Sequence, residues 1–204
     1  LLMLSKYLSD FKITNLSESD DTKTLIDALT KSKKIIDVNH AGTAMRFLVS
    51  YYASTPNSQI ILTGSNRMKS RPIGILVDAL RDLGANIEYE GKEGYPPIKI
   101  IGKKIIMNEV SLPADISSQY ISSLMMLGVK IDNGIKLKLK GNITSKPYIL
   151  MTKKLIEKVG YNVAIKNNQI QVLDRNKSSE TIVEVESDWS SASYFYNIVA
   201  FSKE

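Results

Sequence analysis

The segment Asn39–Arg46, NHAGTAMR, combines residue types that could bind an anion. A β-branched run ends at Val38 and an apolar helical pattern begins at Thr43, so Gly42 and Thr43 fall in the first turn of a predicted helix. Free backbone N–H groups and the positive end of the helix dipole suit such a turn to phosphate or carboxylate. The alternative is that Thr43 only caps the helix and Gly42 only supplies the turn.

A second polar segment favours the anion-binding interpretation. Residues 63–72, TGSNRMKSRP, place Arg67, Lys69 and Arg71 in a loop before another predicted helix, with Pro72 in the first helical turn. Arginine would give such a site bidentate contacts to phosphate or carboxylate. The other loops that precede predicted helices add further donors, namely Ser117, Ser118 and Gln119 in one loop, and Ser145, Lys146 and Tyr148 in another.

These loops contain no evident general base or nucleophile. His40 could titrate near neutral pH, although a lone histidine beside a turn is more often structural. Asp20, Asp21 and Asp188 begin predicted helices, where capping is the ordinary role of Asp and catalysis is the alternative. The residues alone therefore predict a domain that binds small anionic molecules.

Composition argues against several classes of site. The chain of 204 residues has no Cys, which excludes disulfides, thiolate metal sites and cysteine nucleophiles and fits a reducing compartment. A single His argues against a histidine metal site or a Ser-His-Asp triad. No apolar run approaches the roughly 20 residues of a membrane span. The net charge of +6 comes mostly from scattered Lys without an aromatic platform, which argues against a nucleic-acid interface.

Internal repetition defines the predicted architecture. The pattern TG…SRP…LG of residues 63–84 recurs as KG…SKP…VG over residues 140–160. Each copy is predicted to run strand-helix-strand-helix-strand-strand, and residues 1–30 read as the start of a further copy. The predicted fold class is α/β (α+β), built of repeated βαβαββ units whose helices cover one side of mixed sheets.

Several of these motifs together resemble a known family. The matching segments are Ala41–Arg46, Leu62–Leu80, Tyr95–Pro97, Ser117–Gln119, Ser145–Tyr148 and Ser190–Tyr194. They are similar to the 5-enolpyruvylshikimate-3-phosphate (EPSP) synthase family, also called 3-phosphoshikimate 1-carboxyvinyltransferases, and the likeness is collinear from Leu1 to Glu204. The resemblance implies one domain of a two-domain enolpyruvyl transferase fold, in which each domain has three βαβαββ-type units.

The resemblance also implies an activity. The family moves the enolpyruvyl group of phosphoenolpyruvate to the 5-hydroxyl of shikimate 3-phosphate by addition and then elimination of phosphate, with no metal and no organic cofactor. Residues 1–185 would form a substrate-binding domain, and residues 186–204 would begin the crossover to a missing C-terminal domain. Because the family's catalytic acid and base residues would lie beyond Glu204, we expect this chain alone to be inactive.

Site residues carry over from the family position by position. The predicted phosphoenolpyruvate contacts are Gly42, Thr43, Arg71, Gln119 and His40, with the region of Arg46 in support. The predicted shikimate 3-phosphate contacts are Ser117, Ser118, Gln119, Ser145 and Tyr148. His40 stands where many members have Asn, and Phe47 stands where many have Pro. Gly42 is the position that sets glyphosate sensitivity in the family, and Gly predicts a sensitive site.

Two alternatives stay open on the sequence. One is the related enolpyruvyl transferase that acts on UDP-N-acetylglucosamine, although its usual active-site Cys loop has no counterpart here and Ser117–Gln119 favours the shikimate enzyme. The other is a module that binds phosphorylated metabolites without chemistry. The resemblance implies a cytoplasmic enzyme that acts on two small molecules, contacts neither nucleic acid nor membrane, and is a monomer when complete.

Overall fold

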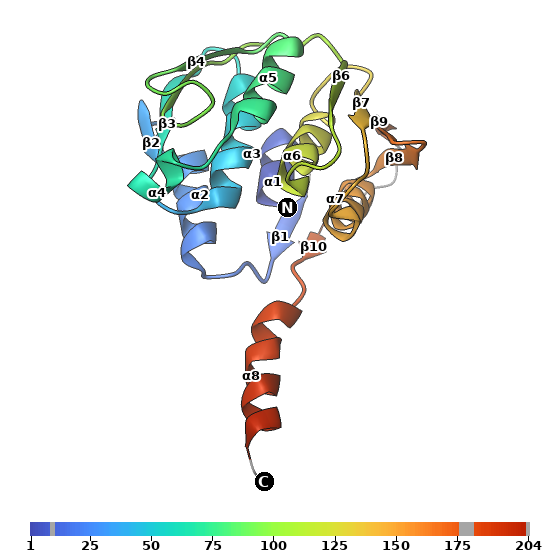
Figure 1. Ribbon diagram of the computed structural model, residues 1–204. Helices are drawn as coiled ribbons and strands as arrows, with labels where there is room; N and C mark the ends of the chain where they lie inside the picture. The colour runs from blue at the N-terminus through green and yellow to red at the C-terminus, as the bar shows by residue number, and fades with distance from the viewer. Residues whose placement is uncertain (9–10, 176–181, 203–204) are drawn as a thin grey trace.

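Two four-stranded sheets repeat one topology in the computed structural model, which describes residues 1–8, 11–175 and 182–202 (Figure 1). In the first sheet the order is β2 (Ile35–Asp37), β3 (Gln59–Thr63), β5 (Ile98–Ile101) and β4 (Asn86–Tyr89). In the second it is β6 (Glu109–Pro113), β7 (Ile135–Lys140), β9 (Gln169–Arg175) and β8 (Tyr161–Lys166). In both sheets the first pair is parallel and the other pairs are antiparallel.

Each sheet carries an inner and an outer helix. These are α3 (Gly42–Ala53) and α5 (Gly74–Asp82) in the first unit, and α6 (Ser118–Leu127) and α7 (Lys146–Lys158) in the second. The inner helices α3 and α6 pack on each other, and α1 (Leu2–Tyr7) packs on α6 (Figure 1). Because α6 lies in the middle, it is buried on nearly all its faces, and Ser118, Ser122 and Ser123 are buried together with its apolar side chains. The predicted strand-helix order of both repeats is confirmed.

A third unit is assembled from segments that are far apart in the sequence. β1 (Lys12–Thr14) pairs in parallel with β10 (Ile182–Glu184), so that Ile13 lies opposite Val183. β10 thereby takes the place that β2 and β6 hold in the other units. α1 is the inner helix of this unit and α2 (Asp20–Thr30) the outer one. The sequence predicted the start of this unit and a strand over Ile182–Val185, but not that this strand pairs with β1 and closes the unit.

The basic loop contains a short helix that the sequence did not predict. α4 (Asn66–Lys69) follows Ser65, whose Oγ accepts a hydrogen bond from the Met68 N–H at 3.3 Å. α5 begins at Gly74, so Pro72 precedes the helix, and its predicted place in the first helical turn is wrong. The physical reason is that Ile73, the N-cap residue, donates its N–H to the Gly94 carbonyl at 2.8 Å and is held outside the helix.

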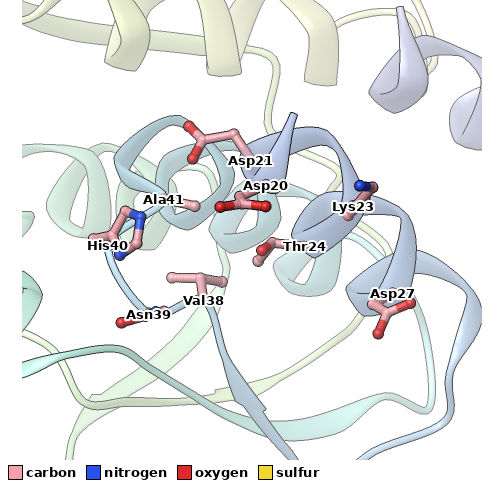
Figure 2. Close-up of a pocket in the computed structure, with 9 residues that line it drawn as sticks. All are labelled: Asp20, Asp21, Lys23, Thr24, Asp27, Val38, Asn39, His40 and Ala41. Atoms are coloured by element: carbon pink, nitrogen blue, oxygen red, sulfur yellow. The ribbon is translucent and has the colours of Figure 1, made fainter. Parts of the chain in front are cut away.

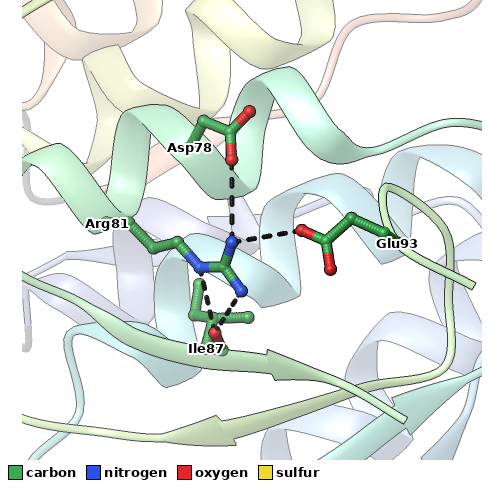
Figure 3. Close-up of polar contacts among 4 residues, drawn as sticks. All are labelled: Asp78, Arg81, Ile87 and Glu93. Atoms are coloured by element: carbon green, nitrogen blue, oxygen red, sulfur yellow. Dashed lines mark hydrogen bonds and ion pairs between the residues drawn. The ribbon is translucent and has the colours of Figure 1, made fainter. Parts of the chain in front are cut away.

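One arginine fixes the outer edge of the first unit (Figure 3). Arg81 on α5 donates from Nε and Nη2 to the Ile87 carbonyl of β4, at 3.0 and 2.8 Å. Its Nη1 lies 3.5 Å from the Glu93 carboxylate and 3.8 Å from that of Asp78. Its guanidinium also lies over the Tyr89 ring, 5.0 Å from the centroid. These contacts tie the end of α5 to β4 and to the loop after it.

The last helix, α8 (Trp189–Phe201), extends away from the body of the molecule (Figure 1). Asp188 is its N-cap and accepts from the Ser190 N–H at 2.9 Å, which confirms the capping role predicted for Asp188. Its large apolar side chains are exposed, with Trp189 at 76% and Phe201 at 86%. Within the described ranges, no helix has the length and apolar character needed to cross a bilayer.

Candidate functional site

The N-terminus of α3 lies against the guanidinium group of Arg71. α3 begins at Gly42, after an N-cap residue, Ala41, that makes no side-chain cap. A Cβ atom placed on Gly42 would lie 2.4 Å from Arg71 Nη1, which is closer than real Cβ contacts. The missing side chain at Gly42 therefore lets the guanidinium of Arg71, from the loop between α4 and α5, lie against the first turn of α3, so that an anion there could meet both the guanidinium and the free amides. The structure brings these two predicted site residues together.

Thr43 connects the start of α3 to the start of α6. Gln119 donates from Nε2 to Thr43 Oγ1 at 2.8 Å across the helix interface. Since the Thr43 hydroxyl is used in this way and no side chain caps α3, the capping alternative for Thr43 is wrong. Gln119 and Thr43, which are 76 positions apart, thus belong to one cluster with Gly42.

A second guanidinium group lies beside that of Arg71. Arg46 is buried on α3 and donates from Nη1 to the Gly42 carbonyl at 2.7 Å. Its Cζ lies over the Tyr120 ring, 5.5 Å from the centroid. A Cβ on Gly42 would be 3.0 Å from both Arg46 Nη1 and Arg71 Cζ, so both guanidinium groups border the same point. Over the described residues neither arginine has a carboxylate partner, in contrast to Arg81.

Two neighbouring cations without a counter-ion repel each other. Burial lowers the pKa of Arg46; Tyr120 opposes this shift, and the charge of Arg71 adds to it. Arg46 Nε is also buried without a hydrogen-bond partner in the described structure. A phosphate or carboxylate beside the two arginines would relieve the repulsion and accept charge-assisted hydrogen bonds. This arrangement is suited to an anion.

The remaining predicted residues lie at the starts of α6 and α7. Ser117 is the N-cap of α6, and its Oγ accepts from the Gln119 N–H at 3.4 Å. Ser118 follows in the first turn and is buried. Ser145 is the N-cap of α7 without a side-chain cap bond, and Tyr148 is half-buried in the first turn. Burial raises the pKa of the Tyr148 phenol.

Hydroxyl contacts hold α7 against α6. Ser122 Oγ and Thr152 Oγ1 are 2.7 Å apart in a buried position, and Thr152 also donates to the Tyr148 carbonyl at 3.1 Å. The first turn of α7 is therefore fixed relative to α6. Gly42, Thr43, Arg71 and Gln119 form a contact cluster, whereas Ser145 and Tyr148 are tied to it through the packing of α7 on α6.

His40 lines a cleft between α2 and the loop that precedes α3 (Figure 2). This cleft of about 470 Å³ is lined by Asp20, Asp21, Lys23, Thr24 and Asp27 of α2 and by Val38, Asn39, His40 and Ala41 of the loop. Its three carboxylates outnumber the one Lys, so its charge differs in sign from that at Gly42. The described residues include no cluster of His, Asp or Glu arranged to hold a metal ion.

The acidic residues of this cleft do not cap α2. Ser19 is the N-cap, and its Oγ accepts from the Thr22 N–H at 3.4 Å. The capping role predicted for Asp20 and Asp21 is therefore wrong. Both instead lie in the first turn, where a carboxylate is favoured by the helix dipole.

Comparison with known proteins places the chain in a family. A family model described as EPSP synthase (3-phosphoshikimate 1-carboxyvinyltransferase) matches residues 3–204. The chain belongs to the EPSP synthase family. A 3-phosphoshikimate 1-carboxyvinyltransferase from Bacteroides fragilis (strain YCH46) is 46% identical over 195 residues, which are 96% of this chain and 47% of that relative. One from Colwellia psychrerythraea (strain 34H / ATCC BAA-681) is 36% identical over 214 residues, with 90% of this chain and 50% of the relative covered.

Solved EPSP synthase structures share the fold. EPSP synthase from Acinetobacter baumannii matches with a TM-score of 0.73 at 20% sequence identity, over 95% of this chain and 49% of that chain. The enolpyruvyl transferase fold implied by the sequence motifs is thus confirmed. The chain spans about half the length of the curated EPSP synthases it matches.

Two side chains at this site make contacts that the sequence did not predict, although the region of Arg46 was expected to support the phosphoenolpyruvate pocket. Arg46 lies four residues after Gly42, one helical turn, so its position relative to the Gly42 carbonyl could have been foreseen. Tyr120 donates its hydroxyl to the Pro72 carbonyl at 2.6 Å, and its place in an apolar helical stripe gave no signal of that contact.

Proposed function

We propose that this chain is the substrate-binding part of a 3-phosphoshikimate 1-carboxyvinyltransferase. The observation that carries the proposal is the pair of arginines, Arg46 and Arg71, beside the N-terminus of α3 without a carboxylate partner among the described residues. Such a site selects phosphate and carboxylate groups. Relatives named for this activity support phosphoenolpyruvate and shikimate 3-phosphate as the anions concerned.

In the proposed reaction, the 5-hydroxyl of shikimate 3-phosphate gives up its proton to a base as its oxygen adds to C2 of phosphoenolpyruvate, and C3 gains a proton from an acid. The tetrahedral intermediate then loses inorganic phosphate, and C3 gives up a proton to restore the double bond. Arg71 would bind phosphoenolpyruvate and stabilise negative charge on the departing phosphate. Gln119, which is fixed by Thr43, would contact both substrates.

The residues of this cluster bind and orient rather than transfer protons, because they include no Asp, Glu or His. We place the proton-transfer groups in the half of the relatives that this chain does not cover. Ser117, Ser118, Ser145 and Tyr148 are proposed to bind shikimate 3-phosphate, as hydroxyl donors near the starts of α6 and α7. His40 is also proposed to contact phosphoenolpyruvate, but only because of its position in the sequence. The carboxylates that line its cleft do not support binding of an anion there.

The division of the chain is also a proposal. Residues 1–185 would form one domain, because β10 closes the third unit at Glu184. Residues 186–204 would lead into a second domain, and the exposed apolar side chains of α8 suit a helix that is covered by further protein. A cytoplasmic location is supported by the absence of Cys, and a monomeric complete protein follows from the family resemblance only.

Calorimetric titration of the chain with shikimate 3-phosphate, and separately with phosphoenolpyruvate, tests the proposal. We expect Ser117→Ala to abolish binding of shikimate 3-phosphate and Arg71→Ala to leave it intact. Phosphoenolpyruvate should show the opposite pattern. Lys104→Ala is the control, because it removes an exposed cation near the far end of α3 and should change neither titration.

Other outcomes discriminate the rival functions. Tight binding of UDP-N-acetylglucosamine would favour the related transferase. Equal binding of unrelated phosphorylated metabolites would favour a module without chemistry. No heat with either substrate, with circular dichroism showing an intact fold, would contradict substrate binding by this chain.

A further inference from the structure

The buried side chain of Arg46 is held by groups from two helices. Its Nη1 donates to the Gly42 carbonyl at 2.7 Å within α3, and its guanidinium lies over the Tyr120 ring of α6. Its main-chain carbonyl accepts from Ser123 Oγ at 2.9 Å, also on α6. Arg46 is thereby fixed at both its backbone and its charged end. A buried guanidinium without an ion pair depends on such carbonyl and aromatic partners.

Tyr120 extends this arrangement to the segment that carries Arg71. The buried Tyr120 donates its hydroxyl to the carbonyl of Pro72, the residue after Arg71, at 2.6 Å. On the other side, the Arg71 N–H donates to the Met68 carbonyl at 3.0 Å. The backbone is therefore anchored at the Arg71 N–H and again at the Pro72 carbonyl, one residue further on. One Tyr120 side chain contacts Arg46 through its ring face and the Arg71 segment through its hydroxyl.

The Arg71 side chain needs such anchoring. It is exposed, and it makes no ion pair within the described residues. Repulsion from the neighbouring Arg46 would drive the two guanidinium groups apart. Since no side-chain bond opposes that repulsion, the position of Arg71 against Gly42 depends on its backbone.

We propose that Arg46 and Tyr120 are positioning residues that hold Gly42 and Arg71 in place before an anion binds. Tyr120 fixes the Arg71 backbone through Pro72, and Arg46 fixes the first turn of α3 through the Gly42 carbonyl. The inference rests on the proposed anion site and assigns to it a supporting pair from the helix interface. A prearranged site loses less conformational freedom on binding, so the pair should raise anion affinity.

The test compares Tyr120→Phe with Tyr161→Phe in the 204-residue chain. Tyr120→Phe keeps the ring under Arg46 and removes the hydroxyl, which donates to the Pro72 carbonyl and also lies beside the Arg46 guanidinium. Tyr161 is the matched control, because its hydroxyl also donates to a backbone carbonyl, that of Val129, at 3.0 Å. Two quantities are measured in each variant: backbone amide hydrogen exchange, and the dissociation constant for inorganic phosphate.

In Tyr120→Phe we expect the Arg71 and Ile73 amides to exchange about three- to tenfold faster, the range expected for one lost hydrogen bond. The dissociation constant for phosphate should rise by a similar factor. Tyr161→Phe should change neither quantity at the site. Arg46→Lys, which keeps the charge but lacks the planar guanidinium, should also weaken phosphate binding.

Uniformly faster exchange along the whole chain in Tyr120→Phe, as in any destabilised variant, would overturn the inference, because it would show a purely structural role. Wild-type phosphate affinity in Arg46→Lys would remove Arg46 from the pair. Failure of the wild-type chain to bind phosphate would instead contradict the proposed anion site. Because the exchange rates at Arg71 need no ligand, they decide the positioning role in either case.

Discussion

At the scale of single residues, the surroundings of each arginine decide its role. Arg81 donates to the Ile87 carbonyl and faces Glu93 and Asp78, so its charge is used in holding α5 to β4 (Figure 3). Arg46 and Arg71 face each other across Gly42 without such partners in the described structure. The residue type and the position in the sequence do not distinguish a structural arginine from an anion-binding one. The presence or absence of neighbouring carboxylates distinguishes them.

Gly42→Ala should separate stability from anion binding. Gly42 is the first helical residue of α3, so its backbone accepts Ala, and Ala is the better helix former. Its Cβ would displace the flexible tip of Arg71, which lies 2.4 Å from that point. We expect an unfolding midpoint equal to or above wild type, and phosphoenolpyruvate binding weakened by about tenfold, or ~1.4 kcal/mol.

The matched control for this substitution is Gly91→Ala. A Cβ at Gly91 meets nothing within 4 Å, so this change should alter neither stability nor binding by much. Calorimetric titration and thermal unfolding monitored by circular dichroism measure the two properties. If Gly42→Ala bound phosphoenolpyruvate as tightly as wild type, the site would not depend on the close approach of Arg71.

At the scale of helices, α3 and α6 are joined by buried hydroxyl groups. Ser50 Oγ lies 2.7 Å from Ser123 Oγ, which donates to the Arg46 carbonyl at 2.9 Å. Ser123→Ala leaves the buried Ser50 hydroxyl without this partner, which should reduce the free energy of unfolding by about 1–3 kcal/mol. Ser50→Ala should cost less when Ser123 is already Ala.

A double-mutant cycle by urea unfolding measures this coupling. The loss in the double variant should be smaller than the sum of the single losses by about 0.5–1 kcal/mol. Additive losses would show that the two hydroxyls do not interact in solution.

The sequence predicted the elements better than their long-range pairing. Apolar periodicity and the repeated loop motifs predicted both complete units, because these signals are local. The parallel pairing of β1 with β10 has no local signal, since the sequence between them does not specify it. α4 was missed because one helical turn, held by Ser65 and the buried Met68, is too short to show periodicity.

The site was predictable in its residue types and only partly in its contacts. Helix starts with Gly and hydroxyl residues pointed to anion binding at Gly42, and the structure brings Arg71 and Gln119 there. The carboxylate-lined cleft around His40 could not be foreseen, because α2 and the loop before α3 come together only in the folded chain. The tie between Tyr120 and Pro72 likewise depends on tertiary packing.

At the scale of the whole molecule, α8 presents an apolar surface to water. Phe195 is 70% exposed and Phe201 is 86% exposed, and the other large apolar side chains of α8 are also more than half exposed. Contiguous exposed apolar side chains favour association with other apolar surfaces. We expect the 204-residue chain to self-associate weakly as its concentration rises, as measured by sedimentation velocity.

A charge on α8 should suppress this association. Phe195→Asp is expected to keep the chain monomeric to higher concentration. Ile106→Asp is the control, because Ile106 is 77% exposed but lies away from α8. A wild-type chain that stays monomeric at all accessible concentrations would contradict the expectation, as would equal effects of the two substitutions.

The pairing of β1 with β10 also sets an order of events during synthesis. Asn15 Nδ2 donates to the Val185 carbonyl at 2.7 Å across a separation of 170 residues. A ribosome adds about 5–20 residues per second, so the interval between synthesis of β1 and synthesis of β10 is on the order of ten seconds or more. The two four-stranded sheets can close during that interval. Of the strands described here, β1 is synthesised first and is among the last to be paired, which leaves its edge open to chaperones and proteases while the two sheets fold.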